Sequence, residues 1–327
     1  SDGPGAETIV SENAPTELLR RSLLSFEPDA LEAEMIALGL PKFRARQLWG
    51  WVWRHGVTDF SDMTDLGKPL QALLSERFHV DRPAVSRRQD SSDGTIKWLI
   101  KLSDGQEAET VYIPDDGRGT LCISSQIGCT LTCSFCHTGT QRLVRNLSVD
   151  EICGQILLAM DELGDWPATR PGRRLTNIVL MGMGEPLANY AETIKAIKTL
   201  NDPNGFNISR RRITVSTSGL VPQLIKLSEQ VNVALAVSLH APNDALRDEL
   251  VPINRKHPID ELLDACWLYA KKQNLRTVTF EYTMLKGVND SKSHALELAK
   301  LLKNKPAKVN LIPFNSFPGV NYECSTR

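Results

Sequence analysis

The 327-residue sequence lacks the roughly 18 consecutive apolar residues that a membrane span requires. Its first ten residues, "SDGPGAETIV", also lack the basic and then apolar order of a signal peptide. Charge of one sign is not in excess either, because 38 Lys and Arg residues face 39 Asp and Glu residues. We therefore expect a soluble, cytoplasmic protein with no membrane partner and no global field that would attract a polyanion.

A disulfide framework is also excluded, because the seven cysteines are odd in number and three of them lie within eight positions. In a chain of this length that distribution favours a metal or catalytic role in a reducing compartment. No internal repeat or low-complexity tract interrupts the sequence. With 41% apolar residues, the chain can form one large α/β domain and a smaller one.

The first part of the chain divides into three segments. Residues 1–16 are small and polar and lack an initiating Met, so we expect a loose end that is either disordered or processed. Apolar residues recur at helical spacing over 17–80, which predicts a small helical accessory domain. Residues 81–117 are expected to be a linker without periodicity over 81–94, followed by a β-hairpin that turns at Asp104-Gly105.

From residue 118 to 327 the sequence alternates short β-rich runs with amphipathic helical stretches. Alternation of this kind predicts a parallel sheet with right-handed crossovers, here a partial (β/α)6 barrel of the α/β class. In such a barrel the active site lies at the carboxyl ends of the strands. The six predicted strands are "TLCISS", "NIVLMG", "RITVST", "VALAVSL", "VTFEYTML" and "KVNLIP".

The loop "IGCTLTCSFCHTGT" follows the first of these strands and spaces Cys129, Cys133 and Cys136 as Cys-x3-Cys-x2-Cys. A structural zinc site closes with four ligands, whereas an iron–sulfur cluster held by three thiolates keeps one iron open. Zinc with His137 as fourth ligand is the less favoured alternative, because adjacent residues rarely reach one tetrahedral centre. Three unligated thiols would be an oxidation hazard.

This loop resembles the motif of the radical S-adenosylmethionine superfamily. The blocks "MGMGEPLANY", "RRRITVSTSGLVP", "FEYTMLKGVND" and "KVNLIPFN" are in addition similar to the RlmN family, which includes the related Cfr branch. The resemblance implies that Cys129, Cys133 and Cys136 hold a [4Fe-4S] cluster whose open iron binds S-adenosylmethionine. It also implies a monomeric methyltransferase that acts on C2 of adenosine in 23S rRNA and tRNA, with an electron donor such as flavodoxin.

The resemblance assigns further residues to cofactor binding. Gly184 and Glu185 in "GMGEP" match the loop that binds the methionyl amino group, although without the cysteine motif they would equally suit a turn. His240 alone would more simply be a structural histidine. The remaining matched positions are Ser216, Ser238, Leu239 and Asn315.

Two more residues match catalytic positions. Adenine C2 is neither nucleophilic nor easily deprotonated, so the family methylates a cysteine first and then uses a 5′-deoxyadenosyl radical to activate that methyl group. Cys122 matches the second cysteine, which removes the C2 proton, and Glu109 matches a proton acceptor. Judged alone, Cys122 would be a small apolar filler and Glu109 an exposed carboxylate, and Cys153 and Cys266 are assigned to filling.

The sequence departs from the family at its end. The family carries the methyl group on a cysteine in a tail of the type "DIxAACGQL", whereas the last residues here are "NYECSTR" and no such motif is present. Either the sequence is part of a longer protein, which we expect because all upstream blocks keep their register, or residues 1–327 cannot turn over.

Alternative functions stay open at this point. A Cfr-like C8 methyltransferase or another radical enzyme would share the cluster, and a non-catalytic, metal-containing RNA-binding module would share the cysteines. Basic runs such as 210–212 and the helix near 41–56 offer phosphate contacts and stacking groups, although such runs are usually solvated faces.

Overall fold

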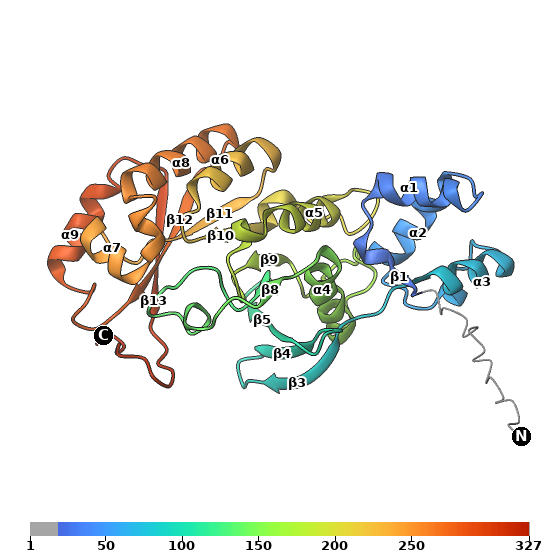
Figure 1. The fold of residues 1–327 in the computed structure, drawn as a ribbon, viewed down its shortest axis with the longest axis horizontal. Helices are drawn as coiled ribbons and strands as arrows, with labels where there is room; N and C mark the ends of the chain where they lie inside the picture. The colour runs from blue at the N-terminus through green and yellow to red at the C-terminus, as the bar shows by residue number, and fades with distance from the viewer. Residues whose placement is uncertain (1–18, 327) are drawn as a thin grey trace, which may run out of the picture.

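A computed structural model describes residues 19–326, so the expected loose end at 1–16 lies outside the described residues. The first helices form a lobe at the right of Figure 1, on the side away from the C-terminus. They are α1 (Pro28–Ala37), α2 (Phe43–Trp53) and α3 (Lys68–Arg77). Their packed faces bury Met35, Leu48 and Trp53, and short strands β1 (Arg21–Ser22) and β2 (Phe78–His79) pair beside them.

The lobe is fastened to the rest of the chain by a close contact. Gly205 lies so near α2 that a Cβ atom there would be 2.6 Å from Trp49 Nε1, and Arg54 Nη2 donates to the Pro203 carbonyl at 2.7 Å.

A nine-stranded sheet in residues 19–326 forms the larger domain, in the order β13-β12-β11-β10-β9-β6-β5-β4-β3. Six of its strands are parallel and follow one another in chain order, which confirms the predicted partial (β/α)6 barrel. They are β6 (Arg118–Cys122), β9 (Asn177–Leu180), β10 (Ile213–Thr217), β11 (Ala234–Ser238), β12 (Val278–Met284) and β13 (Ala307–Pro313).

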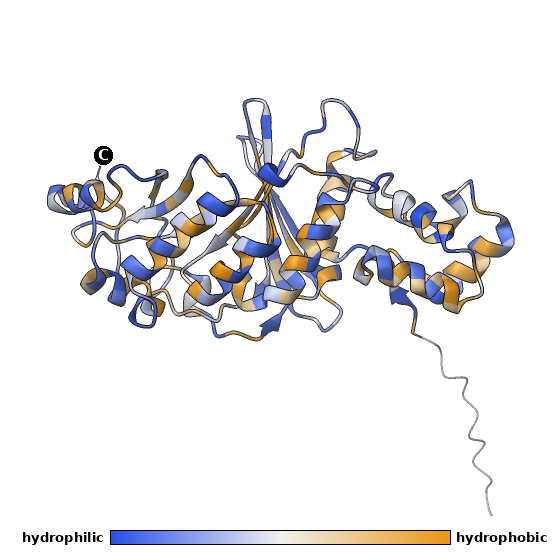
Figure 2. Ribbon diagram, turned by 90° about the horizontal axis from the view of Figure 1, so that it is seen from above, coloured by the Kyte–Doolittle hydropathy of each residue, from blue (hydrophilic) through white to orange (hydrophobic). Residues whose placement is uncertain are grey.

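Helices cover one face of this sheet, and Figure 2 shows both hydrophobic and hydrophilic residues along them. The covered face buries residues such as Leu121, Ile178 and Phe280, while residues of the other face are mostly half-exposed. This alternation is the period of two that a strand with one covered face requires. The helices are α4 (Val149–Leu163), α5 (Tyr190–Asn201), α6 (Val221–Gln230), α7 (Asp244–Leu250), α8 (Ile259–Lys272) and α9 (Lys292–Leu301).

An antiparallel extension widens the sheet beyond β6. Strands β4 (Ile96–Lys101) and β5 (Glu107–Asp115) form the hairpin, with Gly105 at positive φ in its turn. The linker expected over 81–94 is wrong in part, because β3 (Ala84–Asp90) pairs with β4. Every residue of β3 is exposed, so no apolar alternation marks it in the sequence.

The buried apolar side chains fall into two clusters. The larger cluster fills the space between the sheet, its helices and the N-terminal lobe. A smaller, separate cluster packs around the three-cysteine loop and includes Leu131, Phe135, Leu250 and Phe314. Among the helices of the described chain, none combines the length and apolar character needed to cross a membrane.

Candidate active site

A cavity of about 250 Å³ opens at the carboxyl ends of the parallel strands. A larger hollow of about 500 Å³ lies between α1, α2 and residues 202–204, and no cysteine lines it. We place the site at the smaller cavity, because it joins the three-cysteine loop to the strand ends. Of the predicted residues, it is lined by Cys129, Cys133, Cys136, Gly184, Glu185, Ser216, Ser238 and His240.

The three cysteines are free thiols, with Cys133 buried and the other two half-buried. Burial raises the pKa of Cys129 to about 11 and that of Cys133 to about 12, so a bound metal is needed to hold them as thiolates at neutral pH. Within residues 19–326 no three His, Cys, Asp or Glu side chains are arranged to hold one ion. A cluster does not require that arrangement, because each thiolate binds a different iron. The donor set therefore fits a [4Fe-4S] cluster.

The neighbours of the cysteines agree with that fit. The Leu131 N–H donates to Cys129 Sγ at 3.4 Å, a contact of the kind that tunes cluster sulfurs. The His137 ring packs edge-on against Phe317, with centroids 4.9 Å apart. His137 is absent from the residues that line the cavity. The zinc alternative thus gains no support from the structure.

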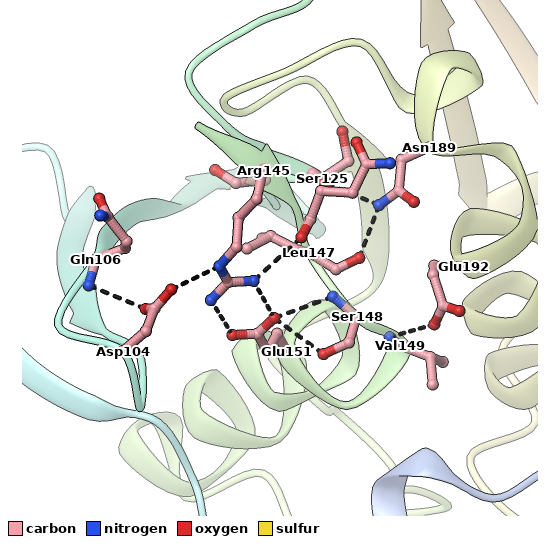
Figure 3. Close-up of polar contacts among 12 residues, drawn as sticks. Asp104, Gln106, Ser125, Arg145, Leu147, Ser148, Val149, Glu151, Asn189 and Glu192 are labelled. Carbon is pink, nitrogen blue, oxygen red and sulfur yellow. Dashed lines mark hydrogen bonds and ion pairs between the residues drawn. The ribbon is translucent and has the colours of Figure 1, made fainter. Parts of the chain in front are cut away.

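The base of the three-cysteine loop is closed by two short strands, β7 (Gln126–Ile127) and β8 (Arg145–Asn146). Arg145 binds both oxygens of Glu151 at 2.7 and 2.8 Å, and its Nε donates to Asp104 Oδ2 at 2.7 Å (Figure 3). Burial alone would raise the pKa of Glu151, but the bonds from Arg145 and Ser148 hold it below its usual value. This network ties the loop to α4 and to the β4–β5 turn.

Gln126 joins the loop to the Gly184-Glu185 turn. Its Oε1 accepts from the Glu185 N–H at 2.9 Å, and its Nε2 donates to Thr130 Oγ1 and Asn146 Oδ1. Gly184 has φ of +100°, and a Cβ atom there would be 2.5 Å from Gln126 Cβ. Glycine is required at this position for both reasons.

Glu185 is almost fully buried at the cavity wall. Burial raises its pKa to about 7, although three donors oppose that effect. The Leu187 N–H, the Thr217 hydroxyl and the Ser218 N–H all donate to this carboxyl, at 3.0, 3.0 and 2.6 Å. The arrangement favours an ionised carboxylate as soon as a cation enters the cavity.

Of the remaining predicted residues at the strand ends, three line the cavity and two do not. Ser216 and Ser238 line the cavity, as does His240, whose Nδ1 accepts from the Thr283 N–H at 2.9 Å. Burial lowers the pKa of His240 to about 3, so the ring is neutral. Leu239 is fully buried, with its side chain outside the cavity, and Asn315 is exposed and does not line it.

Cys122 and Glu109 also lie outside the cavity lining but on the same sheet face. Cys122 pairs with Val111 on β5 and with Val179 on β9, and Val179 in turn pairs with Thr214 on β10. Thr214 lies two residues before the cavity residue Ser216, so both lie on the same sheet face as Cys122. Glu109 is the diagonal neighbour of Cys122, about 7 Å away by strand geometry. Its Oε1 lies 3.4 Å from Lys97 Nζ. Burial raises the pKa of Cys122 to about 11.

Sequence reasoning missed some residues that line the cavity, namely Thr217, Ser218, Glu281 and Thr283. A usable signal exists for two of them. In "VTFEYTM" the polar residues at 279, 281 and 283 alternate with apolar ones, which marks a strand with one polar face. Glu281 is nearly buried there and accepts from Asn310 Nδ2 at 2.8 Å.

Comparisons with known proteins agree with this geometry. Residues 123–299 match the family model of the radical SAM superfamily, and residues 21–80 match the ribosomal RNA large subunit methyltransferase N-terminal domain. The dual-specificity RNA methyltransferase RlmN of Methylobacterium radiotolerans is 56% identical over 99% of this chain and 83% of that protein. The chain belongs to the RlmN family.

Further relatives extend the same result. RlmN of Rhodopseudomonas palustris is 58% identical over 98% of this chain and 85% of that protein. The crystal structure of a radical SAM methyltransferase from Sphaerobacter thermophilus superposes with a TM-score of 0.87 at 44% identity, covering 94% of this chain and 89% of that one. As a member of the RlmN family the chain is a radical SAM RNA methyltransferase, and its cofactors are a [4Fe-4S] cluster and S-adenosylmethionine.

Proposed function

We propose that this RlmN family member methylates C2 of adenosine in 23S rRNA and in tRNA at the adenosine next to the anticodon. The observation that carries the proposal is the single cavity that three thiols, the Gly184-Glu185 turn and the ends of β10 and β11 share. It lies where the fold supports chemistry, and relatives that are 56% and 58% identical carry the name dual-specificity RNA methyltransferase.

The residues of the site would have two roles, namely cofactor binding and proton transfer. Cys129, Cys133 and Cys136 would hold the cluster, which together with S-adenosylmethionine supplies radical chemistry when bound. Glu185 would bind the ammonium group, because its buried carboxylate is already oriented by three donors. Ser216 and Ser238 offer hydroxyl groups on the same wall.

Cys122 and Glu109 would act on the RNA side of the same face. Cys122 would remove the proton from C2 of the covalent protein–adenine adduct and form a disulfide with the methyl-carrying cysteine as the methylated adenine is released. Glu109, two positions along the neighbouring strand from the partner of Cys122, would accept a proton. Burial keeps the Cys122 thiol protonated before RNA binds, so another group must accept the thiol proton before Cys122 can act as a base. Glu109 is the carboxylate that we propose for this role. A target adenine reaches this face only when it is unstacked, which favours loops.

We further propose a monomer that works in the cytoplasm with a low-potential electron donor such as flavodoxin. Exposed Phe43 and the cations Lys42 and Arg46 at the start of α2 support an RNA contact by the N-terminal lobe. Figure 1 places that lobe to one side of the sheet, where it would extend the surface available to a folded RNA.

The test uses the chain with a family-type cysteine tail joined after Arg327, its cluster reconstituted without oxygen. It is incubated with S-adenosylmethionine, a reductant and unmodified 23S rRNA fragments or tRNA, and the digested RNA is analysed by mass spectrometry. We expect 2-methyladenosine, and none in a Cys133→Ala variant. Formation of 8-methyladenosine instead would support the Cfr-like alternative, and no methylated adenosine in either RNA would contradict the proposal.

A further inference from the structure

Arg247 on α7 is fully buried beside the cavity, and no local sequence pattern marks it as buried. Its guanidinium binds neutral groups. Nε donates to the Leu239 carbonyl at 3.0 Å and Nη1 to Asn254 Oδ1 at 3.0 Å, and Nη2 donates to the Ser218 and Ser238 carbonyls at 2.6 and 2.9 Å. All four acceptors are carbonyl or amide oxygens, so none of its hydrogen bonds within residues 19–326 goes to a carboxylate.

A buried cation is costly unless an opposite charge compensates it. Carbonyl oxygens satisfy the hydrogen bonds of Arg247 but leave its charge in place. The carboxylates of Asp244 and Asp248 reach Arg247 only through Asn254. Asn254 Nδ2 donates to both, at 3.0 and 2.7 Å, and Asn254 Oδ1 accepts from Arg247. A group that neutralises the charge of Arg247 must therefore lie on the cavity side of this residue.

Cys133 occupies that side. It lines the same cavity as Ser218 and Ser238, the two residues whose carbonyls accept from Arg247 Nη2. The carboxyl end of α7 also contacts the loop, since the Ser134 N–H donates to the Leu250 carbonyl at 3.3 Å.

A [4Fe-4S] cluster bound by three thiolates is an anion, and one-electron reduction makes it more negative. A fixed positive charge nearby favours the reduced form, and such charges are among the factors that set cluster potentials. His240 supplies no such charge, because burial keeps its ring neutral.

We propose that Arg247 is a positioning residue that places a permanent positive charge beside the Cys133 ligand and makes the cluster easier to reduce. It acts through the cluster and touches no substrate. The electron comes from the external one-electron donor, and no bond forms or breaks at Arg247. This inference rests on the assignment of the three cysteines as cluster ligands in the proposed function.

The test measures the midpoint potential of the cluster by mediated titration with dithionite, followed by electron paramagnetic resonance. Chains of residues 1–327 are reconstituted without oxygen, and iron and sulfide are counted first. Arg247→Gln removes the charge, so we expect a clear shift to more negative potential. Arg247→Lys keeps the charge but loses the planar set of bonds, so we expect a smaller shift.

The matched control is Arg173→Gln. Arg173 is half-buried and, like Arg247, donates to backbone carbonyls, those of Leu175 and Ala168, but it precedes β9 at the end opposite the cavity. We expect the potential of this variant to equal that of the unmodified chain.

Equal potentials in all cluster-loaded chains would overturn the inference, and so would equal shifts in the Gln and Lys variants, because packing alone would then explain them. If Arg247→Gln fails to load a cluster, the midpoint potential of an Asp248→Asn variant is the test instead. Removing that half-buried negative charge should move the potential in the positive direction, and no movement would overturn the inference. Absence of a cluster from the unmodified chain would instead contradict the cysteine assignment.

Discussion

At the scale of single residues, Glu185 combines two opposing demands. Its carboxyl is buried, which favours the neutral form, and three donors surround it, which favours the ionised form. The ammonium group that we propose Glu185 binds would resolve the conflict, because it would supply the missing charge and leave the three donors in place. Cofactor affinity should therefore depend on the charge of this side chain more than on its shape.

Glu185→Gln tests that dependence, because the amide keeps the shape and loses the charge. A hydrogen bond to a charged group contributes roughly 1.5–3 kcal/mol, so we expect S-adenosylmethionine to bind about 10- to 100-fold more weakly. Equilibrium dialysis with the cluster-loaded chain measures this. Glu323→Gln, an exposed carboxylate paired with Lys286, is the control and should change nothing. Unchanged affinity in Glu185→Gln would exclude an ammonium contact.

The functional role of residues that are grouped in a motif could be predicted from the sequence, whereas the burial of an isolated charged residue could not. The spacing of Cys129, Cys133 and Cys136 predicts that the three thiols act at one site, and all three line the same cavity. Arg247 lies in "ALRDEL", where an arginine followed by two acidic residues is typical of a solvated helix face. Its burial follows from the way α7 folds over the strand ends, and no local pattern contains that information.

At the scale of elements, the three-cysteine loop depends on the clamp at its base. Arg145 on β8 links the neighbouring helix α4 to the turn between β4 and β5, whose Asp104 lies 41 residues earlier in the chain (Figure 3). Because the side chain of Glu151 is only 14% exposed, its charge depends on this partner. Loss of the clamp should free the loop before it disturbs the sheet.

We predict that Arg145→Ala lowers the free energy of unfolding by about 1–3 kcal/mol, because Glu151 loses its partner while it stays half-buried. It should also reduce the iron retained after reconstitution. Denaturant unfolding and iron analysis measure the two effects. Arg88→Ala removes exposed ion pairs to Asp90 and Glu162 and should cost no more than about 1 kcal/mol, with full iron content. Equal losses in both variants would contradict the role of the clamp.

The same clamp predicts a dependence on acid. The pKa of Glu151 lies below its usual 4.5 in the folded chain, so its contribution to stability is complete above about pH 4.5. That contribution is lost as the pH falls through the folded value. In Arg145→Ala the acid limb of the stability curve should therefore be shallower.

Elements with one covered face were predictable, and elements without one were not. The six parallel strands alternate polar and apolar residues or are continuously apolar, and five of the expected ranges agree with them to within two residues at each end. The expected strand "TLCISS" extends three residues beyond the end of β6. Strand β3 was missed because all its side chains are exposed and only its backbone pairs with β4. Helix α7 has no recognisable pattern in the sequence, because seven residues are too few to show a helical period.

At the scale of the whole molecule, residues 1–327 include the cavity and Cys122 but no counterpart of the family's methyl-carrying tail. A polypeptide of these residues alone should therefore bind the cluster and leave RNA unmethylated, since covalent transfer needs its nucleophile. Joining a family-type tail should restore methylation, and Cys122→Ala in the extended chain should accumulate a covalent protein–RNA adduct. Gel electrophoresis of labelled RNA detects the adduct. Methylation by residues 1–327 would indicate another methyl carrier, with Cys324 the first to test.

The separation of the buried apolar residues into two clusters bears on the order in which the enzyme matures. The larger apolar cluster contains none of the three cysteines proposed as ligands of the iron–sulfur cluster. We therefore expect the sheet and the N-terminal lobe to fold while the three thiols are still metal-free. The smaller apolar cluster, around Cys133 and Phe135, should then gain part of its stability from bound iron. We therefore expect that a newly made chain can receive iron and sulfide after its sheet and N-terminal lobe have folded.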